Sequence, residues 1–178
     1  MMRTQISALL AQHQAFDATE ARHLAATIEF VQTHPDCCSR HCIPGHITAS
    51  AWVMAPDASA VLLLHHKKLK RWLQPGGHLE DDAEIHLAAM REVREESGLQ
   101  NLRLLSPQIF DVDVHQIPAR GAEAAHYHYD VRFLLQAVDA QLQLSDESNA
   151  LAWVKLEQVA QYSDSPSVLR MAAKSARA

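Results

Sequence analysis

The segment from residue 76 to residue 99 constrains this chain more than any other stretch, because it joins a glycine pair to an acidic helix. Apolar residues recur at helical spacing over 84–97, and Gly98 is a residue type that commonly ends a helix in the left-handed conformation. The pair Gly76-Gly77 lets the backbone approach a ligand closely near the helix start. The segment therefore predicts a sharp break in the chain followed by a helix beside a ligand site.

The acidic residues of this helix fall on its apolar side. On a helical wheel at about 100° per residue, Glu95 and Glu96 lie within about 60° of Glu92, as do the earlier residues Ile85 and Ala88. A solvated run of charges would lie opposite the apolar stripe, so the pattern places these carboxylates in a semi-buried space. Their mutual repulsion is relieved by a hard divalent cation such as Mg²⁺, which prefers oxygen ligands. The alternative is that the three are surface acids paired with the neighbouring arginines.

The remainder of the chain predicts a mixture of helices and strands. Residues 1–34 show helical spacing, with Asp17 as an N-cap and Glu20 as its capping partner. Strands and helices do not alternate strictly, which favours an α+β domain with a mixed sheet. We expect an N-terminal helical extension over 1–45 and one domain over 46–178. The β-rich segments are 47–53, 61–64, 108–115, 126–138 and 150–154, and further helices are expected at 156–162 and 167–176.

Composition excludes several classes of protein. The chain has 178 residues, with 16 lysines and arginines against 21 acidic residues, and its net charge of −5 argues against binding nucleic acid in bulk. The longest apolar run, Val61–Leu64, is far shorter than the about 20 residues of a membrane helix, and the first residues lack the apolar core of a secretory leader. Three clustered cysteines argue against a disulfide framework, so we expect a cytoplasmic protein without membrane contact.

The acidic helix and the residues before it resemble the Nudix box, whose pattern is G-x5-E-x7-R-E-U-x-E-E-x-G-U with U a bulky aliphatic residue. The likeness extends over about 46–160. One position departs from the pattern, because Ala83 stands where the first Glu is expected. Either Asp82 or Glu84 replaces that Glu, or the box arginine loses a partner. The matching residues are Gly77, Arg91, Glu92, Val93, Glu95, Glu96, Gly98 and Leu99.

The resemblance implies a Nudix-type α/β/α sandwich with a mixed central sheet. It also implies a metal-dependent hydrolase that cleaves a diphosphate bond in a small nucleotide-linked substrate. By this resemblance Glu92, Glu95 and Glu96 would hold Mg²⁺ or Mn²⁺, with a backbone carbonyl near Gly77 as a further ligand, and Arg91 would orient the carboxylates by ion pairing. Bound cations would neutralise the diphosphate and activate water, which allows an acidic protein to act as a pyrophosphatase.

Residues outside the box are candidates for further roles. Glu147, in a turn before a late strand, is the candidate general base. The alternatives are that a box Glu is the base and that Glu147 is an ordinary solvated turn acid. His126 and His128 share one face of a predicted strand because side chains alternate along it. Together with His78, these histidines are candidates for substrate contact, against a structural role for each. Arg71 lies in a short basic run that could attract phosphates or form a solvated loop.

Three functional hypotheses follow. The first is the pyrophosphohydrolase, acting on a small phosphorylated substrate. The second is a catalytically weak Nudix-like module that binds or senses a nucleotide, which Ala83 supports. The third is an isomerase of a diphosphate-bearing isoprenoid, which would need a catalytic cysteine, whereas no cysteine follows Cys42. The cysteines lack the C-x2-C spacing of zinc sites, so buried or loop thiols are favoured over a zinc site. Three roles are open for the N-terminal helices: they could cover the cleft, form a homodimer or extend the core.

Overall fold

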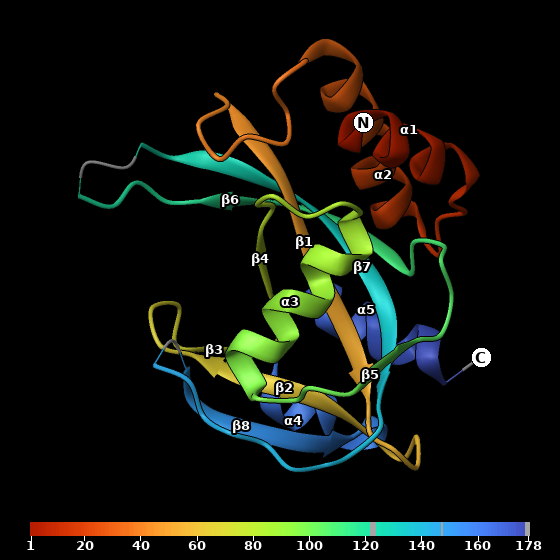
Figure 1. The fold of residues 1–178 in the computed structure, drawn as a ribbon, viewed down its shortest axis with the longest axis vertical. Helices are drawn as coiled ribbons and strands as arrows, with labels where there is room; N and C mark the ends of the chain where they lie inside the picture. Colours follow the sequence, from red (N-terminus) through yellow and green to blue (C-terminus); the bar gives the residue numbers. More distant parts are fainter. Residues whose placement is uncertain (122–123, 147, 177–178) are drawn as a thin grey trace.

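The structure of the chain is a computed structural model that describes residues 1–121, 124–146 and 148–176 (Figure 1). Over these residues, eight strands form one mixed sheet with helices on both faces. No helix in the described ranges is long and apolar enough to cross a membrane. The elements are α1 (Met2–Gln12), α2 (Ala18–Thr33), β1 (Gly45–Met54), β2 (Ala60–His66), β3 (Arg71–Leu73), β4 (Gly76–His78), α3 (Ile85–Ser97), β5 (Leu102–Leu104), β6 (Asp111–Ile117), β7 (His126–Ala137), β8 (Ser148–Lys155), η1 (Leu156–Gln158), α4 (Val159–Tyr162) and α5 (Pro166–Ser175).

The sheet is built around β1 and β7, which run parallel and pair along the full length of β1. β2 pairs with β1, and β3 and β8 pair with β2, all antiparallel. On the other side, β5 and β6 pair antiparallel with β7. The short strand β4 also pairs with β1, with Thr48 opposite His78 and Ser50 opposite Gly76. β1 therefore places β4, β7 and the residues that follow them in one region of the molecule.

Alternation along β1 divides the apolar core into two layers. Ala49 and Ala51 point to the layer formed with α3 and the N-terminal helices. Trp52 and Met54 point to the opposite layer, formed with α4 and α5. Every residue of β1 is buried, which explains why this strand is rich in small and apolar residues. Figure 1 shows α3 in front of the sheet and α4 and α5 behind it, so the predicted α/β/α arrangement is confirmed.

A buried acid joins the N-terminal helices to the sheet. Asp17 accepts a hydrogen bond from the Glu20 amide, which confirms the predicted N-cap of α2. The Glu20 carboxylate is itself buried, and it accepts from the Val112 amide at 3.1 Å. It also lies 2.5 Å from Lys174 Nζ and 2.8 Å from His13 Nε2. Burial alone raises the pKa of Glu20, but the bonds to His13 and Lys174 outweigh it and lower that pKa to about 2. The carboxylate thus ties α2 to β6 and α5.

The boundaries of the predicted elements differ from the observed ones mainly at short strands. The acidic helix α3 begins at Ile85 and is followed by Gly98 with φ 76°, as its residue type indicated. The predicted break at the glycine pair is wrong in its extent, because Gly76 already begins β4. This segment is a strand because it pairs with β1, and that pairing cannot be predicted from the local composition. The irregular segment is limited to Gln74 and Pro75.

Candidate functional site

The glycine pair and the acidic helix meet where β4 packs against α3. Gly76 donates its backbone N–H to Glu96 Oε2 at 2.9 Å. A Cβ on Gly77 would lie 2.6 Å from the carboxyl carbon of Glu92, so the absence of a side chain at Gly77 makes room for that carboxylate. Two of the three predicted carboxylates therefore face the backbone of β4. The Glu92 carboxylate explains the glycine at position 77, whereas a Cβ on Gly76 would lie 2.1 Å from the Cβ of Ser50 on β1.

The three carboxylates differ in exposure. Glu96 is 5% exposed and Glu92 is half-buried, whereas 57% of the Glu95 side chain is exposed. The helical wheel predicted that all three point into a semi-buried space, and for Glu95 this is wrong. Glu95 lies at the outer edge of the shared face and opens to solvent. A set of oxygen ligands that borders water fits a divalent ion that keeps part of its hydration, as Mg²⁺ does.

Arg91 is the centre of an ion-pair cluster on α3. Its guanidinium donates to Glu92 at 2.8 Å and to Glu95 at 3.3 Å. It also donates to the Asp82 carboxylate at 3.3 and 3.1 Å and to the backbone carbonyl of His78 at 2.9 Å. Burial disfavours the charged form, but the hydrogen bonds to Asp82 and Glu92 raise the pKa of Arg91 above its ordinary value. The arginine therefore holds two box carboxylates and β4 in one arrangement.

Asp82 occupies the place that the missing box Glu left open. Its carboxylate, with 10% of the side chain exposed, contacts both Nε and Nη2 of Arg91. Ala83 is exposed, and Glu84 is the N-cap residue of α3, with its carboxylate 3.3 Å from His86. Of the alternatives that the sequence left open, the structure has Asp82 as the partner of Arg91. No pattern on the sequence alone separated Asp82 from Glu84.

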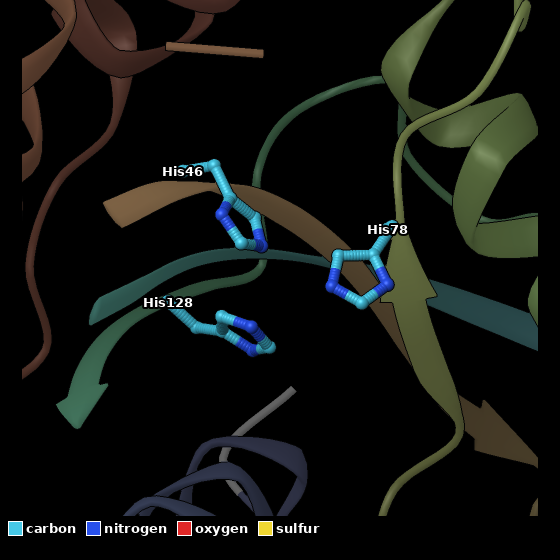
Figure 2. Close-up of side chains that lie close together, drawn as sticks. All are labelled: His46, His78 and His128. Carbon is cyan, nitrogen blue, oxygen red and sulfur yellow. The ribbon is translucent and has the colours of Figure 1, made fainter. Parts of the chain in front are cut away.

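Histidines from three strands meet on the opposite side of β4 from α3. Figure 2 shows the side chains of His46 on β1, His78 on β4 and His128 on β7 directed toward one another. Their ring centroids are 4.8 to 5.3 Å apart. His126 lies beside them, with its Nε2 at 3.3 Å from Nε2 of His128. The sequence indicated that His126 and His128 share a strand face. His46 was not among the predicted candidates, and the register that sets it opposite His128 cannot be read from the sequence.

Burial makes this cluster unfavourable for positive charge. His46 is 2% exposed, and neither of its ring nitrogens has a hydrogen-bond partner within the described part of the chain. Burial and the neighbouring His78 and His126 lower the pKa of His46 to about 4. Burial and the neighbouring His115 lower the pKa of His128 to about 3. Both imidazoles are therefore neutral near pH 7.

A buried ion network continues along the same face of the sheet. Asp130 accepts hydrogen bonds from Ser50 at 2.6 Å and from Arg132 Nε at 2.7 Å. Arg132 also pairs with Asp111 of β6 at 3.2 Å, and Arg170 of α5 donates to the same carboxylate at 2.8 Å. Burial raises the pKa of Asp130, but the Arg132 charge outweighs it and holds that pKa below its usual range. The sequence did not indicate this network, because its members become neighbours only through strand register and the packing of α5 against the sheet.

The other candidate residues lie apart from these contacts. Arg71, on β3, is exposed and pairs loosely with Asp164 at 3.6 Å, and both line an open hollow with Trp72 and Tyr162. The candidate general base Glu147 lies outside the described residues.

The cysteines do not converge on a common point that would suit a metal. Cys42 Sγ lies 3.4 Å from an Asp36 carboxylate oxygen, and burial raises the Cys42 pKa to about 11. The metal-compatible group among the described residues consists of histidines and contains no cysteine. The structure thus agrees with the expectation of buried thiols, since Cys37 and Cys42 are both buried.

Comparisons with known proteins agree with the box and the fold. A family model described as NUDIX domain matches residues 44–173. No curated protein matches the sequence. Among solved structures, a C. elegans Ap4A hydrolase in a binary complex superposes with a TM-score of 0.60 at 20% identity, over 74% of this chain and 95% of that chain. A Nudix-family hydrolase from Clostridium perfringens gives 0.56 at 23% identity, over 74% and 97%. The NUDIX domain of Shewanella oneidensis NrtR, complexed with ADP ribose, gives 0.56 at 16% identity, over 84% and 96%.

Proposed function

This chain belongs to the Nudix family, and we propose that it is a metal-dependent hydrolase that cleaves the diphosphate bond of a small nucleotide-linked substrate. The observation that carries the proposal is the contact between α3 and β4. Glu92 occupies the space that Gly77 leaves free, and Glu96 accepts the Gly76 N–H, so two carboxylates stand against a bare stretch of backbone. A backbone without side chains beside clustered carboxylates suits a hard divalent cation, which is typically shared between protein carboxylates and substrate phosphates.

The residues present fit a hard divalent cation, Mg²⁺ or Mn²⁺. Glu92, Glu95 and Glu96 would hold it, with the backbone carbonyl of Gly77 as a further oxygen ligand. When bound, the cation supplies neutralisation of the phosphates and an activated water. Arg91 positions the carboxylates, because it donates to Glu92 and Glu95 at the same time.

Residues outside the box are proposed for the remaining roles. Glu147 remains the candidate for the base that accepts a proton from water, because it directly precedes β8 in the sequence. Arg71 is the candidate for a contact with a distal phosphate, because it is exposed beside an open hollow. Substrate contacts by His78, His126 and His128 stay a prediction. The alternative is a structural role for these histidines, since their side chains are at least partly buried and lie next to one another.

The nucleotide-binding alternative drew its support from Ala83. The bonds between Asp82 and Arg91 weaken that support, because the box arginine keeps an acidic partner. A complex with ADP ribose is known for the NUDIX domain of NrtR, which makes ADP-ribose a compound to include in any binding assay. The hydrolase is therefore the preferred proposal.

A turnover screen tests the proposal. The full chain is incubated with dinucleoside polyphosphates, nucleotide sugars, ADP-ribose, nucleoside triphosphates and coenzyme derivatives, in the presence of Mg²⁺, Mn²⁺ or a chelator. We expect release of a phosphorylated product from at least one compound with a metal ion and none with the chelator. Tight binding of one compound without turnover of any would contradict the enzyme and favour the nucleotide-binding module.

A further inference from the structure

We infer that His46, His78 and His128 form a second metal site, one that binds Zn²⁺ or a similar nitrogen-preferring transition metal through three imidazoles. This site is separate from the carboxylates of α3 and does not rest on the proposed hydrolase activity. Each histidine can present one ring nitrogen to a common point, and these three nitrogens lie within 4.8 Å of one another. The side chains come from three different strands, so their convergence is a property of the fold (Figure 2).

The ring spacing matches that of a tetrahedral site. With zinc–nitrogen distances of about 2.0–2.1 Å and tetrahedral angles, the ring centroids of two imidazole ligands lie about 5.2 Å apart. The observed separations are 5.0 Å for His46 and His78, 4.8 Å for His46 and His128, and 5.3 Å for His78 and His128. The bound nitrogens would be about 3.4 Å apart in the same geometry. Metal binding would therefore require the three imidazole rings to rotate, without movement of their centroids.

The state of His46 points to a ligand. This side chain is 2% exposed, and both ring nitrogens lack a hydrogen-bond partner within the described residues. A buried polar side chain without a hydrogen-bond partner destabilises the folded protein. A metal ion bound at one nitrogen would remove much of that destabilisation. Burial also keeps His46 and His128 neutral at pH 7, and the neutral imidazole is the form that binds a metal.

The chemistry of the ligand set separates this site from the carboxylate site. Imidazole suits Zn²⁺, Co²⁺ and Ni²⁺, whereas Mg²⁺ selects oxygen ligands. Successive residues of β4 point to opposite sides, so Gly77 faces Glu92 while His78 faces His46. His78 nevertheless links the two regions, because its backbone carbonyl accepts a hydrogen bond from Arg91. A metal ion at the histidines would hold β1, β4 and β7 together behind the carboxylates.

A cobalt titration tests the site directly. Full-length protein without a polyhistidine tag is titrated with Co²⁺ in excess Mg²⁺, and the visible absorption of nitrogen-bound tetrahedral cobalt is recorded. We expect one equivalent to bind, and each of His46→Gln, His78→Gln and His128→Gln to weaken binding at least about 100-fold. Two controls should bind Co²⁺ as the parent does. His65→Gln removes a histidine on β2 that bonds to Asn149, and Glu96→Gln alters the carboxylate site.

A second measurement does not depend on the folding of any variant. X-ray absorption at the zinc edge of the unaltered protein, loaded with one equivalent of Zn²⁺, counts the imidazoles bound to the ion. We expect about three imidazole nitrogens at about 2.0–2.1 Å. A shell of oxygens without imidazole would overturn the inference, and so would cobalt absorption that is unchanged in all three histidine variants.

Discussion

Replacing Asp82 by alanine should slow turnover while leaving the fold intact. Asp82 holds Arg91 through two hydrogen bonds of 3.3 and 3.1 Å, and the two side chains are 10% and 21% exposed. A hydrogen bond to a charged group contributes about 1.5–3 kcal/mol. Because solvent partly screens this half-buried pair, the two bonds together contribute about the same amount as one fully buried bond of this kind. If this free energy serves to align Arg91 with Glu92, its loss lowers kcat by about 10- to 100-fold, since about 1.4 kcal/mol corresponds to a factor of ten.

The assay measures kcat and KM separately, with circular dichroism as the check on folding. Asp81→Ala is the matched control, because Asp81 is the adjacent acid and is exposed. The double variant Asp82→Ala/Ala83→Glu puts an acid at the position that the box pattern prescribes, and it should recover most of the lost kcat. A merely structural role for Asp82 would not be rescued in this way. An Asp82→Ala variant with the kcat of the parent would refute the reasoning.

Two further predictions concern the contact between β4 and α3 and the buried Glu20 of α2. Gly77→Ala places a Cβ 2.6 Å from the Glu92 carboxyl carbon, so that carboxylate must move, and the Mg²⁺ concentration for half-maximal activity should rise at least about tenfold. An unchanged Mg²⁺ dependence would count against Glu92 as a ligand. For Glu20, the pKa is lowered from 4.5 to about 2, which corresponds to stability on the order of 3 kcal/mol that is present above pH 4.5 and lost as pH falls toward 2. Denaturant unfolding measured at pH 7 and at pH 3 should show that the parent loses about 2 kcal/mol more than Glu20→Gln, because at pH 3 the folded-state carboxylate is still mostly ionised and other buried acids are shared by both proteins. Equal losses in both proteins would contradict the prediction.

The parts of the site that depend on local sequence were predictable. The spacing of apolar and acidic residues over α3, with Gly98 after it, identified the helix and the resemblance to the Nudix box. Helical geometry also predicted that Glu92 and Glu96 face inward, and both are at least half-buried. These features could be read from the sequence because a helix places its side chains by residue spacing alone.

The parts that depend on strand register were not predictable. β4 becomes a strand only through pairing with β1, and His46 meets His128 only because β1 and β7 are parallel in that register. The partner of Arg91 was open for a related reason, since the turn before α3 decides whether Asp82 or Glu84 reaches the guanidinium. A single sequence contains no direct record of such contacts between distant segments.

The central claim is that carboxylates of α3 hold the metal ion that diphosphate cleavage requires. The most direct measurement is kcat of Glu96→Gln at saturating Mg²⁺, on whichever compound the parent hydrolyses, with thermal unfolding measured in parallel. The replacement amide can still accept the Gly76 N–H, so the fold should keep its stability while kcat falls by orders of magnitude. Turnover equal to that of the parent, in a variant that remains folded, would contradict the claim.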